Sequence, residues 1–251
     1  MITYHFFRKE ENHMLQADLH THSIASGHGD SITINAMARK ASERGIRLLG
    51  ISDHGPATPG AARLSYFRSL KNAPRTRESI TLRYGAEANI LSYQGELDIP
   101  DDILSTLDYV IVSIHRSLLE PGSIQENTNA YLAAMEHPNV RIIGHCDDAR
   151  YQIDYQELIS AARKRNILPE INNASLLPEQ YRGDTRDNLR SILSCCRSID
   201  YPVLLSSDSH SLADVGNVSL AEDFVKAEQF PSELILNHSS HSCLSWLDRS
   251  V

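Results

Sequence analysis

Short apolar segments recur along the chain, and each is followed by a polar or amphipathic stretch of helical character. Strands that alternate with helices form right-handed β–α–β units, and successive strands then pair in parallel. Seven such strands suit either a closed barrel or an open doubly wound sheet, and periodicity alone does not choose between them. No GxGxxG or P-loop motif opens a helix, which argues against a nucleotide-binding open sheet. The predicted strands are Leu15–Leu19, Arg47–Ile51, Arg83–Ala88, Tyr109–Ile114, Val140–Gly144, Ile167–Ile171 and Val203–Leu205.

The stretches between these strands carry the start and stop signals of helices. Ser31 and Asp154 stand where N-cap residues are expected, because their side-chain oxygens can accept hydrogen bonds from the first helical N–H groups. Gly45 stands where a helix is expected to end in a left-handed residue. The predicted helices are Ser31–Arg44, Asn127–Glu136, Tyr155–Arg165 and Thr185–Cys196.

The length of the chain, 251 residues, is enough for one domain with a large buried core. The sequence has no internal repeat and no Pro/Gly-rich linker. We therefore predict a single α/β domain over residues 1–251, with residues 1–13 as an N-terminal extension.

Charge and apolar content exclude several classes of function. A formal net charge of -8 argues against a nucleic-acid-binding surface, but bound cations would still allow a small phosphorylated substrate. No apolar run approaches the roughly 18 residues of a membrane span, and the N-terminus lacks the apolar core of a secretion signal. The four cysteines form no CxxC pair, so we expect reduced thiols in a cytoplasmic protein.

Metal-binding residue types follow nearly every predicted strand. The carboxyl ends of strands in a parallel α/β fold point to one face, so residues scattered over the sequence are expected to converge there. A single histidine after a strand would ordinarily be a polar loop residue, but a ligand type at so many strand ends is poorly explained by chance. The predicted ligands are His20, His22, His28, His54, Glu87, His115, His145, Asp208 and His210. The remaining histidines are interpreted as ordinary polar residues: His5, His13, His137, His238 and His241.

Local spacing supports the same interpretation. His20 and His22 are two residues apart, as are Asp208 and His210, and such residues share a face of an extended strand. Imidazoles with a few carboxylates suit Zn, Mn or Fe rather than Ca, which prefers oxygen ligands. Nine ligands are too many for one ion, so we expect two or three divalent transition-metal ions that share a bridging carboxylate, with Zn favoured.

These motifs resemble the PHP (polymerase and histidinol phosphatase) metallophosphoesterase superfamily, particularly its YcdX-like bacterial phosphatases. The resemblance implies a distorted (β/α)7 barrel of the TIM-like kind, with a trinuclear site at the carboxyl ends of the strands. Residues 1–13 and the segment after about Glu222 carry no motif of the family. The matching motifs are DLHTHSIASGHG at 18–29, ISDHG at 51–55, GAEANI at 85–90, SIHRS at 113–117, IGHCDD at 143–148, PEINNAS at 169–175 and SSDSH at 206–210.

The resemblance also implies how the ligands are divided, with Glu87 bridging two of the three ions. The first ion would be bound by His20, His22, Glu87 and Asp208, the second by Glu87, His115 and His145, and the third by His28, His54 and His210.

Such a site predicts hydrolysis of a phosphate monoester. Metal coordination lowers the pKa of water from 15.7 to about 7, so hydroxide between the ions that share Glu87 is expected to attack phosphorus. Glu87, Asp208 and His210 are the predicted catalytic residues. Arginine can grip phosphate with two N–H groups, so the predicted substrate-binding residues are Arg116, Arg150 and Asn172. Asp18 and Asp53, each close to a ligand histidine, are expected to orient an imidazole or to stabilise the fold.

Three alternatives remain open at this point. Histidinol-phosphate phosphatase belongs to the same superfamily, and a proofreading nuclease activity occurs in its polymerase-associated members. A metal-binding module without turnover is the third, but it predicts a missing ligand, and all nine positions are filled. The resemblance also implies a homo-oligomer, since some members of the superfamily form trimers.

Overall fold

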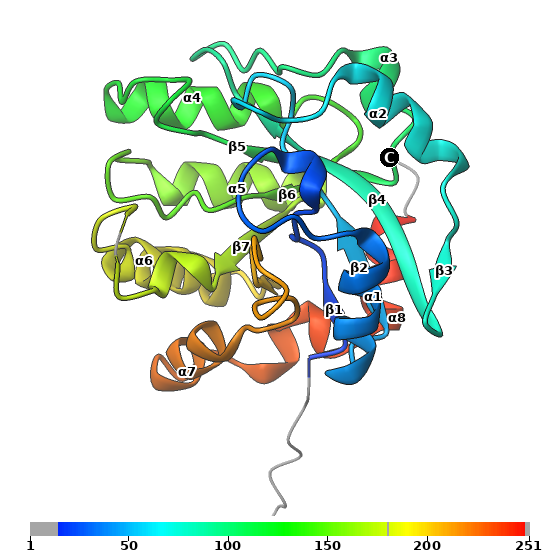
Figure 1. Cartoon of the computed structure of the whole chain (residues 1–251). Coiled ribbons are helices and arrows are strands. Elements are labelled where there is room, and N and C mark those ends of the chain that lie inside the picture. Colours follow the sequence, from blue (N-terminus) through cyan, green and yellow to red (C-terminus); the bar gives the residue numbers. More distant parts are fainter. Residues whose placement is uncertain (1–14, 180, 249–251) are drawn as a thin grey trace, which may run out of the picture.

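The computed structural model describes residues 15–179 and 181–248, and in them seven parallel strands form a nearly closed barrel. The strands lie in the order β1-β2-β4-β5-β6-β7-β8, and helices pack around the outside, with α4, α5, α6 and α7 stacked along one side (Figure 1). Of the two architectures that the sequence allows, the barrel is therefore the one observed. The seven strands are β1 (Ala17–Asp18), β2 (Leu48–Ile51), β4 (Ile80–Asn89), β5 (Tyr109–Ser113), β6 (Val140–Ile143), β7 (Leu168–Asn172) and β8 (Leu204–Ser206).

The predicted extension, residues 1–13, lies outside the described residues. A short strand that the sequence did not predict, β3 (Thr76–Arg77), pairs antiparallel with the start of β4 through a turn at Glu78 and Ser79, both with positive φ. None of the helices in the described ranges is long and apolar enough to cross a membrane. The helices are α1 (Ile34–Glu43), α2 (Leu64–Ser69), α3 (Asp101–Leu104), α4 (Ile124–Ala134), α5 (Tyr155–Arg165), α6 (Arg186–Ser198), α7 (Ser219–Ala227) and α8 (Ser240–Leu247).

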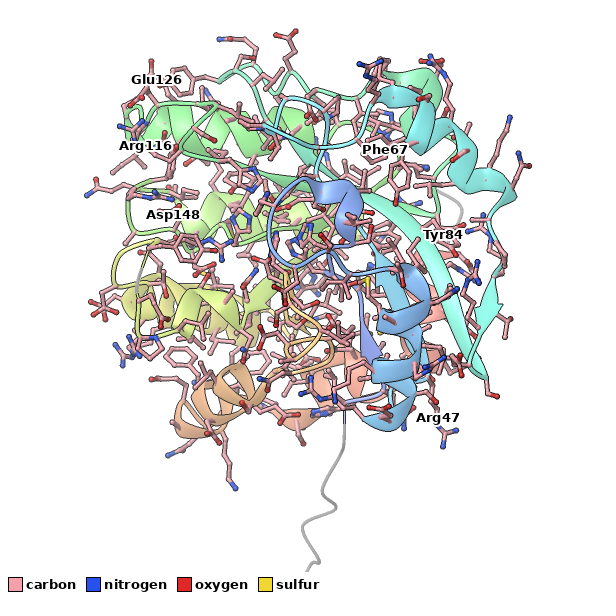
Figure 2. All side chains as sticks on the ribbon, viewed as in Figure 1. Arg47, Phe67, Tyr84, Arg116, Glu126 and Asp148 are labelled. Carbon is pink, nitrogen blue, oxygen red and sulfur yellow. The ribbon has the colours of Figure 1, made fainter. Side chains whose placement is uncertain are left out.

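Most barrel strands are buried on both faces because side chains fill the interior and helices cover the exterior. All residues of β2, β5, β6, β7 and β8 are buried. Phe67 of α2 and Tyr84 of β4 are among the largest fully buried side chains, and Figure 2 shows where they lie. Strands buried on both sides cannot alternate apolar and polar residues, which explains the continuous apolar segments in the sequence.

Helix caps set where the helices begin. Asp154 accepts a hydrogen bond from the backbone N–H of Glu157, which confirms it as the N-cap of α5. The prediction for Ser31 is wrong, because Thr33 is the N-cap of α1 and its hydroxyl accepts from the N–H of Ala36. Gly45 has a φ of 77°, the left-handed conformation expected after α1.

The seam between β1 and β8 closes the barrel, and at its amino-terminal part a side chain replaces strand pairing. Asn237, fully buried, donates to the carbonyls of Ala17 (2.9 Å) and Leu205 (2.6 Å) and accepts from the N–H of Leu205 (3.1 Å). Asn237 belongs to the short helix η5 (Leu236–His238), in the segment to which the sequence assigns no motif. One amide side chain thus makes the hydrogen bonds that a direct β1–β8 ladder would otherwise make.

Nearer the carboxyl ends the two chain segments bond directly. The N–H of Asp208 donates to the carbonyl of His20 (2.9 Å), and the N–H of His22 donates to the carbonyl of Ser209 (3.0 Å). Ligand residues predicted from opposite ends of the sequence are therefore neighbours across the seam.

Candidate metal centre

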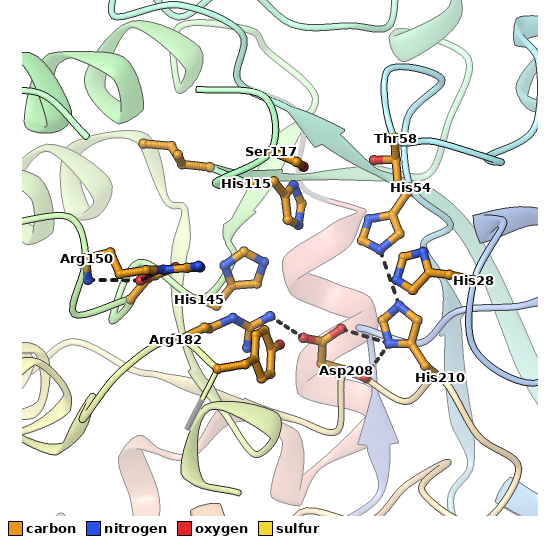
Figure 3. A pocket seen from close by; sticks show the side chains of 13 residues that line it. His28, His54, Thr58, His115, Ser117, His145, Arg150, Arg182, Asp208 and His210 are labelled. Atoms are coloured by element: carbon orange, nitrogen blue, oxygen red, sulfur yellow. Dashed lines mark hydrogen bonds and ion pairs between the residues drawn. The ribbon is translucent and has the colours of Figure 1, made fainter. Parts of the chain in front are cut away.

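The nine predicted ligands come together at the carboxyl end of the barrel. Six of them are labelled around one pocket in Figure 3. The other three are buried beside them: His20 and His22 follow β1, and Glu87 lies in β4. The six labelled residues are His28, His54, His115, His145, Asp208 and His210.

Glu87 lies at the centre of the cluster. Its side chain is fully buried, and each of its two oxygens faces a different group of rings. Oε2 lies 2.6 Å from His54 Nδ1, 3.4 Å from His20 Nε2 and 3.6 Å from His22 Nε2. Oε1 lies 2.8 Å from His145 Nε2 and 3.4 Å from His115 Nε2.

The two carboxylate oxygens of Asp208 also have different neighbours. Its Oδ1 lies 3.1 Å from His22 Nε2 and 3.5 Å from His20 Nε2. Its Oδ2 accepts hydrogen bonds from Arg182 (2.8 Å) and Asn172 (3.1 Å). One oxygen thus remains directed at the imidazoles while the other is fixed by neighbouring side chains.

In the third predicted group, the ring of His28 stacks on the rings of both His54 and His210. The centroid of His28 lies 4.8 Å from that of His54 and 4.5 Å from that of His210, and the Nε2 atoms of His54 and His210 are 3.3 Å apart. His28 itself is exposed, so this group is the most open to solvent. Three triads in the described residues have ligand atoms within 4.8 Å of one another: His20, His22 and Asp208; His22, His54 and His210; and His54, Glu87 and His115.

The chemistry of these side chains fits divalent cations. Four buried atoms that face one another have no hydrogen-bond partner among the described residues: His20 Nε2, His22 Nε2, His54 Nδ1 and Glu87 Oε2. Buried polar atoms are nearly always paired, so a group of them directed at one point indicates a bound species. Neutral imidazoles and ionised carboxylates are the side chains that bind zinc and similar ions.

The pKa shifts of the cluster side chains also favour a bound cation. Burial alone would raise the pKa of Glu87, but the imidazoles of His54, His20 and His115 lower it well below its ordinary value. Burial lowers the pKa of His115 to about 4. Burial, together with His210 and His54 nearby, also lowers the pKa of His22 well below its ordinary value. Glu87 is therefore expected to be ionised and the rings of His22 and His115 to be neutral, and the carboxylate attracts a cation.

His20 differs, because carboxylates surround it. Burial lowers its pKa, but Glu170, Asp208 and Glu87 together raise it well above the ordinary value. The same negative field would stabilise a metal ion next to this ring.

Backbone strain accompanies two of the ligands. His145 has a φ of 24° and Asp208 a φ of 51°, a region that residues other than glycine rarely adopt. The backbone N–H of His145 donates to Glu170 Oε2 (2.7 Å), which helps to hold this conformation. Strained residues of this kind cluster at functional sites, where the surrounding structure compensates for their cost.

Side chains behind the ligands fix the orientation of three rings. Glu170 contacts Nδ1 of His20 at 2.6 Å, and Ser26 contacts Nδ1 of His22 at 2.9 Å. Nδ1 of His115 lies 2.6 Å from Oδ1 of Asn89. Because each Nδ1 is occupied, each Nε2 remains directed into the cluster. Sequence reasoning missed Glu170, Ser26 and Asn89.

The two aspartates near ligand histidines do not contact imidazoles through hydrogen bonds. Asp18 accepts from the hydroxyl of Ser207 (2.5 Å) and from the N–H of Gly216 (3.0 Å), so it stabilises the fold around the seam. Asp53 accepts from Ser26 (2.8 Å), and Ser26 is the residue that contacts His22. Asp53 therefore acts on an imidazole only through an intermediate hydroxyl.

A pocket of about 210 Å³ opens above the cluster. Arg150 lines it and is paired with Asp148 (2.5 Å); Arg182, which the sequence analysis did not single out, lines it as well. Arg116 is not part of the lining; it forms an ion pair with Glu120, and Figure 2 shows it at the periphery of the molecule. Asn172 lies behind the ligands, where it donates to Glu170 (3.0 Å) and Asp208. The substrate contacts predicted for Arg116 and Asn172 stay predictions.

Comparison with known proteins gives three results. The model of the PHP domain family matches residues 18–174. Proteins named "probable phosphatase" from Clostridium acetobutylicum and Clostridium novyi are 40% and 38% identical to this chain, over 92% of it and 93% of their own length. A crystal structure of histidinol phosphate phosphatase from Lactococcus lactis, in complex with zinc, L-histidinol and phosphate, shares the fold with a TM-score of 0.60. It is 18% identical, and the match covers 87% of this chain and 95% of that one.

Proposed function

The chain belongs to the PHP domain family, and from this membership we propose that it is a metal-dependent phosphatase that hydrolyses small phosphate monoesters. The names of its relatives support this reaction class. The formal net charge of -8 favours a small substrate over a nucleic acid, and it leaves phosphate binding to the bound cations and a few arginines.

The observation that carries the proposal is the position of Glu87. A single buried carboxylate has five imidazoles around it, divided between its two oxygens. A set of cations would satisfy the lone pairs that these side chains direct at one another. We infer that Glu87 bridges two divalent ions, with Zn favoured and Mn or Fe as alternatives, and that His28, His54 and His210 hold a third.

Bound divalent ions would supply an activated water at neutral pH and offset the negative charge of the phosphoryl group. The residues of the chain provide the geometry. Arg182 and Asn172 hold Oδ2 of Asp208 so that Oδ1 stays directed at the cluster, and Glu170 fixes the ring of His20. The guanidinium groups of Arg150 and Arg182 line the pocket, where their N–H groups can bind phosphoryl oxygens.

Elemental analysis of protein purified without added metal tests the cluster first. We expect two to three equivalents of Zn, Mn or Fe for each chain. Less than one equivalent, with none taken up on reconstitution, would mean that the histidines serve the fold alone. Phosphate release from a panel of monoesters that includes L-histidinol phosphate then tests the reaction and the main alternative for the substrate.

A matched pair of substitutions links metal to activity. Glu87→Gln keeps the size of the side chain but removes the charge, so we expect loss of at least one metal equivalent and of phosphate release. Glu157→Gln makes the same change at an exposed position of α5 and should alter neither. Near-normal turnover in Glu87→Gln would refute the bridging role.

A further inference from the structure

Asn89 stands directly behind one of the ligand rings. It follows Glu87 by two residues in β4, so the two side chains share a face of the strand, and Asn89 is fully buried. Its Oδ1 lies 2.6 Å from Nδ1 of His115, and Nε2 of the same ring faces Oε1 of Glu87 at 3.4 Å. A neutral imidazole has a lone pair only at the nitrogen that carries no hydrogen. The position of this hydrogen therefore decides whether His115 can bind an ion.

The amide of Asn89 does not settle that position alone. It can turn over, which exchanges the carbonyl oxygen and the NH2 group that face His115. Thr58, labelled in Figure 3, does not settle it either, because a hydroxyl both donates and accepts. Its Oγ1 lies 3.2 Å from Nδ2 and 3.4 Å from Oδ1 of Asn89. A group that only accepts is needed on one side of the amide.

Asp98 provides that group. Its Oδ2 accepts from Nδ2 of Asn89 (2.6 Å) and from the N–H of Ala57 (3.0 Å), and its Oδ1 accepts from the N–H of Asn89 (2.9 Å). Burial raises the pKa of Asp98, but these donors oppose the rise, so the carboxylate is expected to be ionised at neutral pH. An ionised carboxylate has no hydrogen to donate. The NH2 group of Asn89 therefore faces Asp98, and its carbonyl oxygen faces His115.

The path of the chain places Asp98 next to Asn89. Leu97 forms an antiparallel bridge with Ile90, and the N–H of Asp98 donates to the carbonyl of Asn89 (3.2 Å). Gly55, the glycine of the ISDHG motif, leaves room for the carboxylate, because a Cβ there would lie 2.2 Å from both oxygens of Asp98. This motif glycine thus helps to place a carboxylate that is outside the predicted ligand set.

We propose that Asp98 is a positioning residue of the metal centre: through the amide of Asn89 it holds the ring hydrogen of His115 on Nδ1 and leaves Nε2 free for a divalent ion. The inference rests on the metal-dependent function proposed above. Without Asp98 the amide can turn over, its NH2 group then donates to Nδ1, and the ring hydrogen moves to Nε2. A ring in that form directs an N–H at Glu87 and has no lone pair for an ion.

The wild-type chain, freed of metal with a chelator, gives the first test. Couplings between ring protons and ring nitrogens in NMR spectra distinguish the two neutral forms of histidine, and the signal of His115 is identified by its loss in His115→Gln. We expect the hydrogen on Nδ1. A hydrogen on Nε2 would overturn the inference, and this result does not depend on how any variant of Asp98 folds.

Asp98→Asn gives the second test, because it keeps the shape of the side chain but adds a group that can donate. The amide of Asn89 then has no single preferred orientation. We expect one metal equivalent to bind about 10- to 100-fold more weakly in a chelator competition, the loss that removal of a ligand-orienting residue causes. Asp102→Asn makes the same change at an exposed position of α3 and should leave every metal affinity unchanged.

Exchange of the two side chains separates orientation from simple disruption. In the double variant Asn89→Asp/Asp98→Asn, a carboxylate stands next to His115 and an amide stands behind it, with the net charge unchanged. Nδ1 again faces a group that only accepts, so we expect most of the affinity lost in Asp98→Asn to return, with the ring hydrogen on Nδ1.

The outcomes separate this inference from the proposed function. If Asp98→Asn binds its full metal complement with wild-type affinity, or if the exchange binds no better than Asp98→Asn, the positioning role is overturned and the metal-dependent phosphatase stands. If the wild type binds no metal and hydrolyses no monoester, the proposed function fails and the inference fails with it.

Discussion

Asn237 is predicted to contribute more to stability than any local sequence signal would suggest. Replacement by alanine removes three hydrogen bonds between its side chain and the backbones of β1 and β8. Each is worth about 1 kcal/mol net, so the loss in the free energy of unfolding is about 3 kcal/mol, provided that water does not replace the amide. For a chain of this length the corresponding decrease in Tm is about 6 to 12 °C.

Urea denaturation followed by circular dichroism, with a chelator present, measures this loss without a contribution from metal binding. Asn237→Asp keeps the size and one acceptor but loses both donated bonds and buries a charge, so it should be at least as destabilised as Asn237→Ala. Asn129→Ala, at an exposed position of α4, should change stability by no more than about 0.5 kcal/mol. A loss below 1 kcal/mol in Asn237→Ala would refute the view that this side chain closes the barrel.

Further expectations concern the ligands and the thiols. Chelation of the metal should lower Tm, and titration of Zn should restore it, because ions that bind only the folded chain stabilise it by mass action. Glu170→Gln should weaken metal affinity by about 10- to 100-fold in a chelator competition, since it loses the carboxylate that orients His20, whereas Glu157→Gln should not. Native protein should react with a thiol reagent at no more than Cys195, and at all four cysteines in urea, because Cys195 is partly exposed whereas the other three thiols are buried; these are Cys146, Cys196 and Cys243.

The alternation of strands and helices could be predicted because the strands are buried on both faces and helices such as α4 and α5 carry side-chain caps; the closed barrel itself followed from the family resemblance. Helix α5 has the predicted bounds, Tyr155–Arg165, since Asp154 caps it at one end and Asn166 ends it in a left-handed conformation. Helix α4 begins three residues before the predicted Asn127, because Ser123 and Glu126 form a capping box. Helices α2 and α3 are too short to give a periodic signal, and neither was predicted.

The metal ligands could be located because strand ends converge, and this needs no knowledge of side-chain geometry. Glu170 could have been found by the same rule, since Glu170 and Asn172 repeat the two-residue spacing at the end of a predicted strand. Arg182 could not, because it lies in a loop with no motif and reaches the site only through the folded path of the chain. Asn237 could not be predicted either, because it lies in a segment without sequence signals and contacts residues far away in sequence.

The seam also determines when the protein can acquire its ions during synthesis. His20 leaves the ribosome early, but Asp208 and Asn237 follow only near the end of the chain, roughly 10 to 40 s later at ordinary rates of translation. Until then β1 has no partner on that side, and contacts over such sequence distances form late because closing the loop costs entropy. The nascent chain therefore presents isolated histidines instead of a cluster, and metal loading falls to the completed polypeptide.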